Sequence, residues 1–240
     1  MIEAAKEAMR VVRVLDMQFP TGPGKTGSAF LAPAQRKLLT CAHVVTDDKG
    51  QRPSLITVRK PGGASYESTL LSLDAAFDLA TLEAREDAAP AHARSELPQV
   101  GESVIFAGSP QGVARSSVFP GMVSAVGAGL ISFPKCDVVQ IAGMINNGNS
   151  GGPLLDRNGA VLGVITAKYV PLLREIDKLR QDLEQIPQFP RNVGIGGVDF
   201  SAFVNMTVKS MWQIAAVLRL VQVGTGWAVP ATYFSKVGGV

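Results

Sequence analysis

Three residues of this 240-residue sequence, His43, Asp78 and Ser150, have side chains that can break a covalent bond when they act together. A serine hydroxyl is a weak nucleophile until a neighbouring imidazole takes its proton. A carboxylate on the other side of the imidazole then fixes the ring tautomer and stabilises its charged form. The sequence therefore contains the parts of an acyl-transfer site, provided that the fold brings the three groups together.

Ser150 lies in the glycine-rich stretch GMINNGNSGGPLL, residues 143–155. Glycine is costly to order, so such a cluster indicates a tight turn, backbone at positive φ, or amide groups close to a ligand. Three interpretations follow: a simple hairpin loop, a phosphate cradle, or a nucleophile on a turn whose N–H groups form an oxyanion hole.

The sequence offers two histidines as a base for Ser150. His92 lies in a connection rich in alanine and proline, where a solvated side chain is expected. His43 ends the apolar run LLTCAHVV, where a strand can hold it rigidly, although a structural histidine would also suit that place. Asp78 is flanked by apolar residues as if it entered a buried strand, where an imidazole N–H and backbone amides would compensate its burial. Asp74 is predicted to be a turn residue.

The composition sets limits on the class of protein. With 46% hydrophobic and 18% charged residues the chain can bury a sizeable core, and its net charge of +3 comes without a dense basic block of the kind a nucleic-acid groove needs. Two cysteines are too few for a disulfide scaffold or a closed zinc site, so no metal or cofactor is expected, and a single bridge stays possible. The N-terminus lacks a signal-peptide core and no window reaches the roughly 20 apolar residues of a membrane span, which favours a cytoplasmic location.

The elements that must position these residues are mostly short strands. Residues 11–82 alternate β-type runs with turn signals, residues 91–100 form a connection, and strands resume beyond it, with DRNG as a hairpin turn. Two helices are then predicted within an insert at about 170–223. The first has an apolar stripe after Pro171, and the second covers about 205–221. These helices could pack on the β body, cover a site as a lid, or contact a protein partner or a second copy.

Six segments in order resemble trypsin-like (chymotrypsin-fold) serine peptidases of the HtrA/Deg branch: LLTCAHVV, FDLATLEA, AGSPQG, GMVSAV, NNGNSGGPLLDRNGAVLGVIT and GTGWAVP. The resemblance implies an all-β fold of two antiparallel six-stranded β-barrels, with a helical insertion in the second. It places the first lobe at residues 1–90 and the second at 101–240.

The same resemblance assigns roles to the candidate residues. Ser150 would attack a peptide carbonyl, His43 would take and return the proton, and Asp78 would orient His43. The oxyanion hole is expected in the segment Gly148–Asn149–Ser150, with the N–H groups of Gly148 and Ser150 as donors. Activity should therefore rise with pH through about 6 to 7, as His43 loses its proton.

Four residues are expected to line the pocket for the side chain before the cut: Met144, Thr166, Ala167 and Gly226. None is acidic, so small or medium apolar side chains are favoured over Lys or Arg. Ala29 and Cys41 replace residues usual in the family, and about 55 residues separate GVIT from the GTGWAVP segment. No PDZ module is recognised in the sequence, so regulation by one is not expected.

Two other functions also fit parts of the sequence. The stretch PTGPGKTGS, with Gly24, Lys25 and Thr26, resembles the end of a nucleotide-binding P-loop, but Phe19 stands where such a loop needs glycine. The second alternative is a catalytically latent scaffold of the same fold that binds a protein partner through the helical insert.

Overall fold

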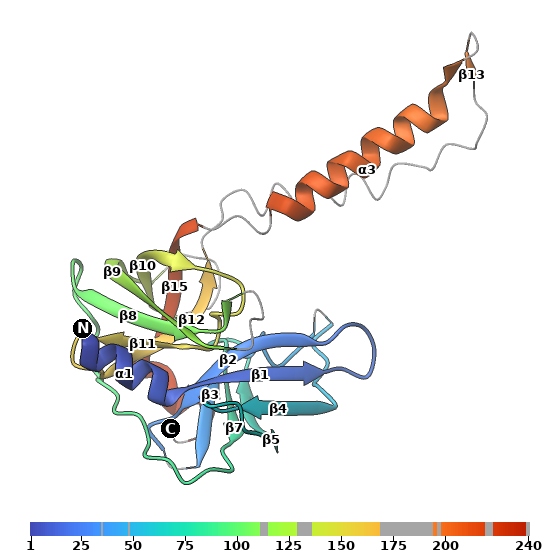
Figure 1. Cartoon of the computed structure of the whole chain (residues 1–240). Helices are drawn as coiled ribbons and strands as arrows, with labels where there is room; N and C mark the ends of the chain where they lie inside the picture. The colour runs from blue at the N-terminus through green and yellow to red at the C-terminus, as the bar shows by residue number, and fades with distance from the viewer. Residues whose placement is uncertain are drawn as a thin grey trace. The chain divides into compact units, whose positions relative to one another are not determined.

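The computed structural model describes residues 1–34, 36–47, 49–110, 115–128, 136–168, 194–195, 198–218 and 223–238. The chain divides into two compact units, one formed by Met1–Tyr169 with Val223–Val240 and the other by Val170–Gln222. The larger unit contains two β lobes (Figure 1). The candidate site residues His43, Asp78 and Ser150 all belong to this unit.

The first lobe is one antiparallel sheet with the strand order β5-β4-β1-β2-β3-β7-β6. Buried and partly exposed residues alternate along the strands that have one face towards solvent. In β4, Ile56 and Val58 are buried, while the other three residues are only partly buried. The bounds are β1 Val12–Gln18, β2 Lys25–Leu31, β3 Lys37–Thr40, β4 Leu55–Arg59, β5 Ser65–Ser68, β6 Leu70–Asp74 and β7 Leu79–Glu83.

The two edge strands of this sheet are almost one strand. Thr69 alone separates β5 from β6, so a single bent stretch joins the two edges and curls the sheet. Counted in this way the lobe has six strands, and the chymotrypsin-like fold class expected from the sequence is confirmed.

The second lobe is a closed antiparallel barrel with the strand order β10-β15-β12-β11-β8-β9. Its interior holds Phe106, Ile141 and Leu154, all fully buried. The predicted hairpin turn between β11 and β12 is confirmed, because Asp156 Oδ1 accepts the N–H groups of Asn158 and Ala160. The bounds are β8 Ser103–Gly108, β9 Ser117–Gly127, β10 Val138–Ile145, β11 Pro153–Asp156, β12 Val161–Lys168 and β15 Val223–Pro230.

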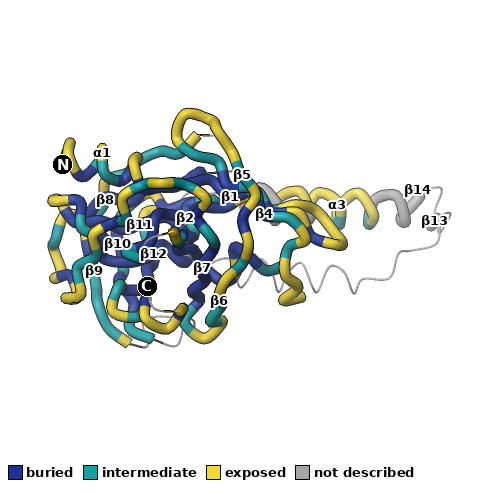
Figure 2. The backbone as a smooth tube through the Cα atoms, turned by 90° about the horizontal axis from the view of Figure 1, so that it is seen from below, coloured by how far each residue is buried: buried dark blue, intermediate teal, exposed yellow. Residues whose placement is uncertain are grey.

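Each end of the chain packs on both lobes. Helix α1, Ile2–Val11, leads into β1 of the first lobe but contacts β8, β9 and β11 of the second. The 3-10 helix η2, Ala231–Val237, follows β15 and buries Phe234 and Val237 in a hydrophobic cluster to which both lobes contribute. The two lobes are thereby held together, and Figure 2 shows buried backbone gathered in the strands of this unit.

The smaller unit contains helix α3, Phe200–Leu218, and the short antiparallel pair β13, Gly194–Ile195, with β14, Val198–Asp199. The predicted second helix is therefore confirmed, although it begins at Phe200 rather than near residue 205. The helix predicted after Pro171 lies outside the described residues. In the described part of the chain, none of the helices is long and apolar enough to cross a membrane.

Candidate active site

His43 and Asp78 are brought together by two paired strands. Strands β3 and β7 are antiparallel neighbours, so the segment after the end of β3 meets the segment before the start of β7. His43 Nδ1 lies 2.8 Å from Asp78 Oδ2, and the backbone N–H of His43 donates to Asp78 Oδ1 at 2.9 Å. The carboxyl is 1% exposed and the imidazole 46%, so only the ring can be reached by a substrate.

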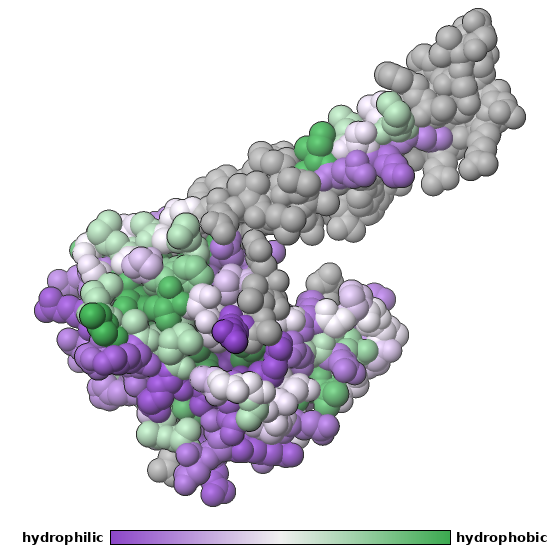
Figure 3. Space-filling model, in the orientation of Figure 1, coloured by the Kyte–Doolittle hydropathy of each residue, from purple (hydrophilic) through white to green (hydrophobic). Residues whose placement is uncertain are grey.

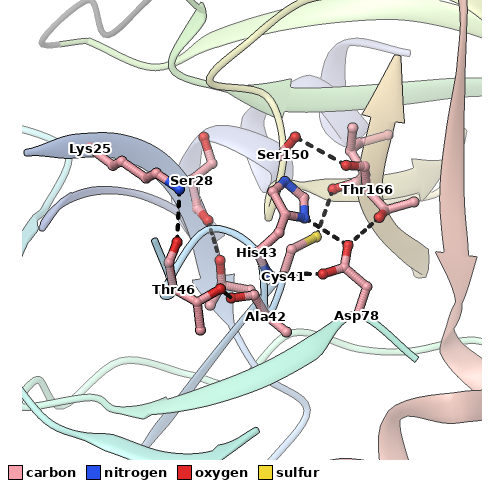
Figure 4. A network of polar contacts seen from close by, with 11 residues as sticks. Lys25, Ser28, Cys41, Ala42, His43, Thr46, Asp78, Ser150 and Thr166 are labelled. Atoms are coloured by element: carbon pink, nitrogen blue, oxygen red, sulfur yellow. Dashed lines mark hydrogen bonds and ion pairs between the residues drawn. The ribbon is translucent and has the colours of Figure 1, made fainter. Parts of the chain in front are cut away.

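Asp78 also receives a hydrogen bond from the second lobe. Thr166 on β12 donates its hydroxyl to Asp78 Oδ2 (Figure 4). Asp78 has φ +53°, a left-handed conformation that aspartate tolerates better than most residues. Each carboxyl oxygen is thus partnered, which compensates for burial. Asp74, predicted to be a turn residue, does accept the backbone N–H of Ala76 and so closes the turn before Asp78.

Ser150 reaches the same network from the second lobe. Its hydroxyl donates to the carbonyl oxygen of Thr166 at 3.2 Å. Figure 4 shows the imidazole of His43 between Asp78 on one side and Ser150 on the other. Within the described residues, no hydrogen bond joins Ser150 Oγ to the imidazole, so the Ser150 hydroxyl must turn its proton from the Thr166 carbonyl towards the ring before proton transfer.

The backbone around Ser150 presents two N–H groups that have no acceptor in the described part of the chain, those of Gly148 and Ser150. Gly148 has φ +94°, where a side chain would be strained. The N–H of Asn149, by contrast, donates to the Asn146 carbonyl at 3.1 Å. Within the expected segment, the Asn149 N–H is thus already bonded, and the assignment of Gly148 and Ser150 as the donors of the oxyanion hole stays a prediction.

Gly151 explains a further part of the glycine cluster. A Cβ at this position would lie 2.0 Å from the Ser28 carbonyl oxygen and 2.3 Å from Thr40 Oγ1. Both of those residues belong to the first lobe. The absence of a side chain lets the serine loop lie directly against strands β2 and β3, which brings Ser150 close to His43.

Cys41 lies close to the hydrogen-bonded pair of His43 and Asp78, called the dyad below. It is fully buried, and its Sγ lies 3.1 Å from the Ile165 carbonyl oxygen. Its burial, and then the negative charge of Asp78, raise the pKa of this thiol well above its ordinary value. The donor atoms of Cys41, His43 and Asp78 lie within 4.8 Å of one another, which is the spacing of a metal site. The thiol is protonated, however, and Asp78 is already partnered, so the arrangement fits a hydrogen-bonded dyad better than a metal centre.

The four expected specificity residues have different surroundings. Met144 on β10 is 53% exposed, and Figure 3 shows hydrophobic side chains at the surface of the second lobe. Gly226 on β15 pairs with β10 and β12, and Ala167 lies on β12, although its side chain is outside the described part. Thr166 is corrected, because its buried hydroxyl binds Asp78 instead of lining a pocket.

The remaining sequence candidates take no part in the site. His92 is exposed, and its carbonyl accepts the N–H of Val161. The P-loop interpretation is wrong: PTGPGKTGS runs through the turn between β1 and β2, Lys25 begins β2, and its ammonium donates to the Thr46 carbonyl. No helix follows that turn. Cys41 and Cys136 are both free thiols, so the possible disulfide is absent.

Residues 27–164 match the family described as the trypsin-like peptidase domain. A protein named probable periplasmic serine endoprotease DegP-like, from Rhizobium meliloti (strain 1021), is 33% identical over 176 residues, covering 70% of this chain and 34% of its own length. The chain thus spans about a third of the length of that relative.

Solved structures give the same fold. The HtrA-type protease AlgW with tripeptide superposes with a TM-score of 0.69 at 23% identity, covering 98% of this chain and 61% of that one. The active form of the Rv3671c protease from M. tuberculosis gives a TM-score of 0.60 at 26% identity, covering 70% and 74%. The cytoplasmic location expected from the sequence finds no support in the name of the Rhizobium relative, and it stays a prediction.

Proposed function

Because the chain belongs to the family of trypsin-like peptidase domains, we propose that it is a serine endopeptidase similar to the HtrA and DegP proteases. Its substrates are polypeptides, and Ser150, His43 and Asp78 carry the reaction. One observation supports this most directly: a buried carboxyl of the first lobe binds an exposed imidazole and is linked through Thr166 to the serine of the second lobe.

The proposed reaction has two halves. Ser150 Oγ attacks the scissile carbonyl carbon while His43 Nε2 takes the hydroxyl proton, and the resulting imidazolium is stabilised by Asp78. Collapse of the tetrahedral intermediate breaks the C–N bond, and His43 gives the proton to the departing amine. Water then enters, His43 removes its proton, and hydrolysis of the ester releases the second product and restores Ser150.

The N–H groups of Gly148 and Ser150 stabilise the negative oxygen of both tetrahedral intermediates. Removing one such donor typically slows the reaction by about 10²–10³-fold. The pocket that selects the residue before the cut stays a proposal, built from Met144, Ala167 and Gly226 on the adjacent strands β10, β12 and β15. Small or medium apolar side chains are the proposed preference.

The smaller unit, Val170–Gln222, is the proposed place of regulation or of contact with a protein partner or a second copy. Its helix α3 has exposed apolar side chains, including Met206 at 64% and Ile214 at 59%. Contact with another protein would cover them.

One observation favours the catalytically latent alternative. Ser150 donates its hydroxyl to the Thr166 carbonyl, and within the described residues it makes no hydrogen bond to the His43 imidazole. This is the arrangement expected of an inactive site. Such bonds often tighten only when substrate binds. The latent form would need an activating partner before the Ser150 hydroxyl turns towards the ring.

A fluorophosphonate probe tests the proposal, because it reacts only with an activated serine. We expect labelling of the intact chain that is lost in Ser150→Ala and strongly slowed in His43→Ala. Casein cleavage should follow the same order. Failure of the wild-type chain to be labelled or to cleave, with and without peptides offered as activators, would instead support the latent scaffold.

A further inference from the structure

Ser28 on β2 is a fully buried serine whose hydrogen bonds cross from the first lobe to the serine loop of the second. Its backbone N–H donates to the Ser150 carbonyl at 3.0 Å, and its hydroxyl donates to the Gly148 carbonyl at 2.6 Å. We propose that Ser28 is a positioning residue for the oxyanion hole. The inference rests on the proposed peptidase function and assigns a role to a residue outside the triad.

The geometry shows how Ser28 acts through the backbone. A peptide unit is planar, so fixing a carbonyl also fixes the N–H on its other side. Ser28 holds the carbonyls of Gly148 and Ser150, which lie on either side of the peptide between Asn149 and Ser150. The carbonyl of that middle peptide accepts the N–H of Gly152 at 2.9 Å. The bond from Gly152 therefore sets the direction of the Ser150 N–H, and the two bonds from Ser28 hold the peptide units on either side of it.

Ser28 is itself held rigidly. Its hydroxyl oxygen accepts the backbone N–H of Ser109 at 2.9 Å, and its carbonyl accepts the hydroxyl of Thr40 at 2.7 Å. Both faces of the Ser28 hydroxyl are thus used, which fixes the direction of its proton towards Gly148. Strand β2 lies between β1 and β3, so the backbone of Ser28 cannot follow a movement of the loop.

The loop has little else to replace this anchor. The side chain of Asn149 is fully buried, and neither of its polar atoms has a partner within the described residues. Among the described residues, the Gly148 carbonyl otherwise receives only the Ser109 N–H, at the longer distance of 3.3 Å. Without the Ser28 hydroxyl, the peptides around Gly148 gain freedom to turn, and the two donors lose their common direction.

The test replaces Ser28 by alanine and measures kcat, KM and inhibition by a peptide boronate, whose tetrahedral adduct with Ser150 places an oxygen in the oxyanion hole. We expect kcat to fall about 10–100-fold with KM within about twofold, and boronate affinity to weaken with kcat, because the lost interaction acts in the transition state. Ser68→Ala is the matched control. Ser68 is also a buried first-lobe serine whose hydroxyl donates to a carbonyl, that of Glu83 at 2.7 Å.

Ser28→Cys keeps the volume with a weaker donor and should give an intermediate kcat, which covers the case in which Ser28→Ala does not fold. A kcat within about threefold of wild type in both variants, or an equal loss in Ser68→Ala, would overturn the inference. Amide NMR signals of Gly148 and Ser150 provide a readout that does not need activity. They should shift in Ser28→Ala even if the wild-type chain cleaves nothing, and unchanged signals would overturn the inference independently of the peptidase proposal.

Discussion

Gly151→Ala tests whether the serine loop is seated directly on the first lobe. Gly151 has φ +85°, and a Cβ there would lie 2.0 Å from the Ser28 carbonyl oxygen and 2.3 Å from Thr40 Oγ1. Neither neighbour can move away easily, because one is backbone of a central strand and the other is a fully buried side chain. The new methyl group must therefore push the loop away from β2.

The expected cost has two parts. Left-handed backbone costs an L-residue about 1–2 kcal/mol. Forcing a methyl group into a packed site costs about 1–3 kcal/mol more. The sum is about 2–5 kcal/mol, and for a chain of this size each kcal/mol lowers Tm by about 2–4 °C, so a decrease of about 4–20 °C is expected.

Gly62→Ala is the matched control. Gly62 has φ +91°, almost the same backbone strain, but nothing lies within 4 Å of a Cβ built there. Its variant should lose only the backbone part, about 1–2 kcal/mol. Differential scanning calorimetry and the rate of fluorophosphonate labelling would be measured on both. If Gly151→Ala were no less stable than Gly62→Ala and were labelled at the wild-type rate, the proposed contact between loop and first lobe would be refuted.

Three further predictions concern the rest of the larger unit. Glu86→Gln removes the charged partner of Arg13, 2.7 Å away with both side chains buried, and should cost about 1–3 kcal/mol at pH 7 in urea unfolding. Burial alone would raise the pKa of Glu86, but the hydrogen bond and charge of Arg13 lower it overall. The Glu86 carboxylate therefore stabilises the fold above about pH 4.5. The unfolding free energies of the variant and the wild type should converge as pH falls below that value, and a difference that stays constant with pH would contradict this. Burial and a neighbouring negative charge raise the pKa of Cys136 to about 11, so iodoacetamide should modify it progressively faster from pH 8 to 11 while the buried Cys41 stays unmodified in the native protein, as intact mass would show. Phe234→Ala should cost about 3–5 kcal/mol in the same unfolding assay, since this ring is buried in the hydrophobic cluster formed by both lobes, and a loss below 1 kcal/mol would mean that η2 does not pack there.

Local patterns predicted much of this fold. Alternating apolar residues marked the strands, and DRNG marked the hairpin between β11 and β12, because both signals depend on neighbours in the sequence. His43 and Asp78 could be selected because each stands at the end of an apolar run, and such runs become paired strands. The structure places them 2.8 Å apart, through the pairing of β3 with β7.

Other features depend on contacts between distant segments. Helix α1 was not predicted, although Ile2–Val11 consists largely of good helix formers; its packing on β8, β9 and β11, about a hundred residues further along the chain, is not visible in that local pattern. Thr166 was expected to line a pocket, but the register of β12 turns its hydroxyl to Asp78. The bond from the Asn149 N–H to Asn146 is a matter of loop conformation, which the glycine-rich sequence left open.

The distance between His43, the proposed base, and Ser150, the proposed nucleophile, therefore depends on how the two lobes pack against each other. Phe77, next to Asp78, stacks on Tyr233 of η2 with ring centroids 5.2 Å apart, and the Tyr233 hydroxyl donates to Asp137 beside the second barrel. Cys41, two residues before His43, donates to the Ile165 carbonyl, which also accepts the N–H of Gly151. Each member of the dyad is therefore flanked by a residue that contacts the part of the chain carrying Ser150. A substitution that loosens these contacts should lower the rate of acylation, because acylation requires the imidazole and the serine hydroxyl to be held in the correct relative position.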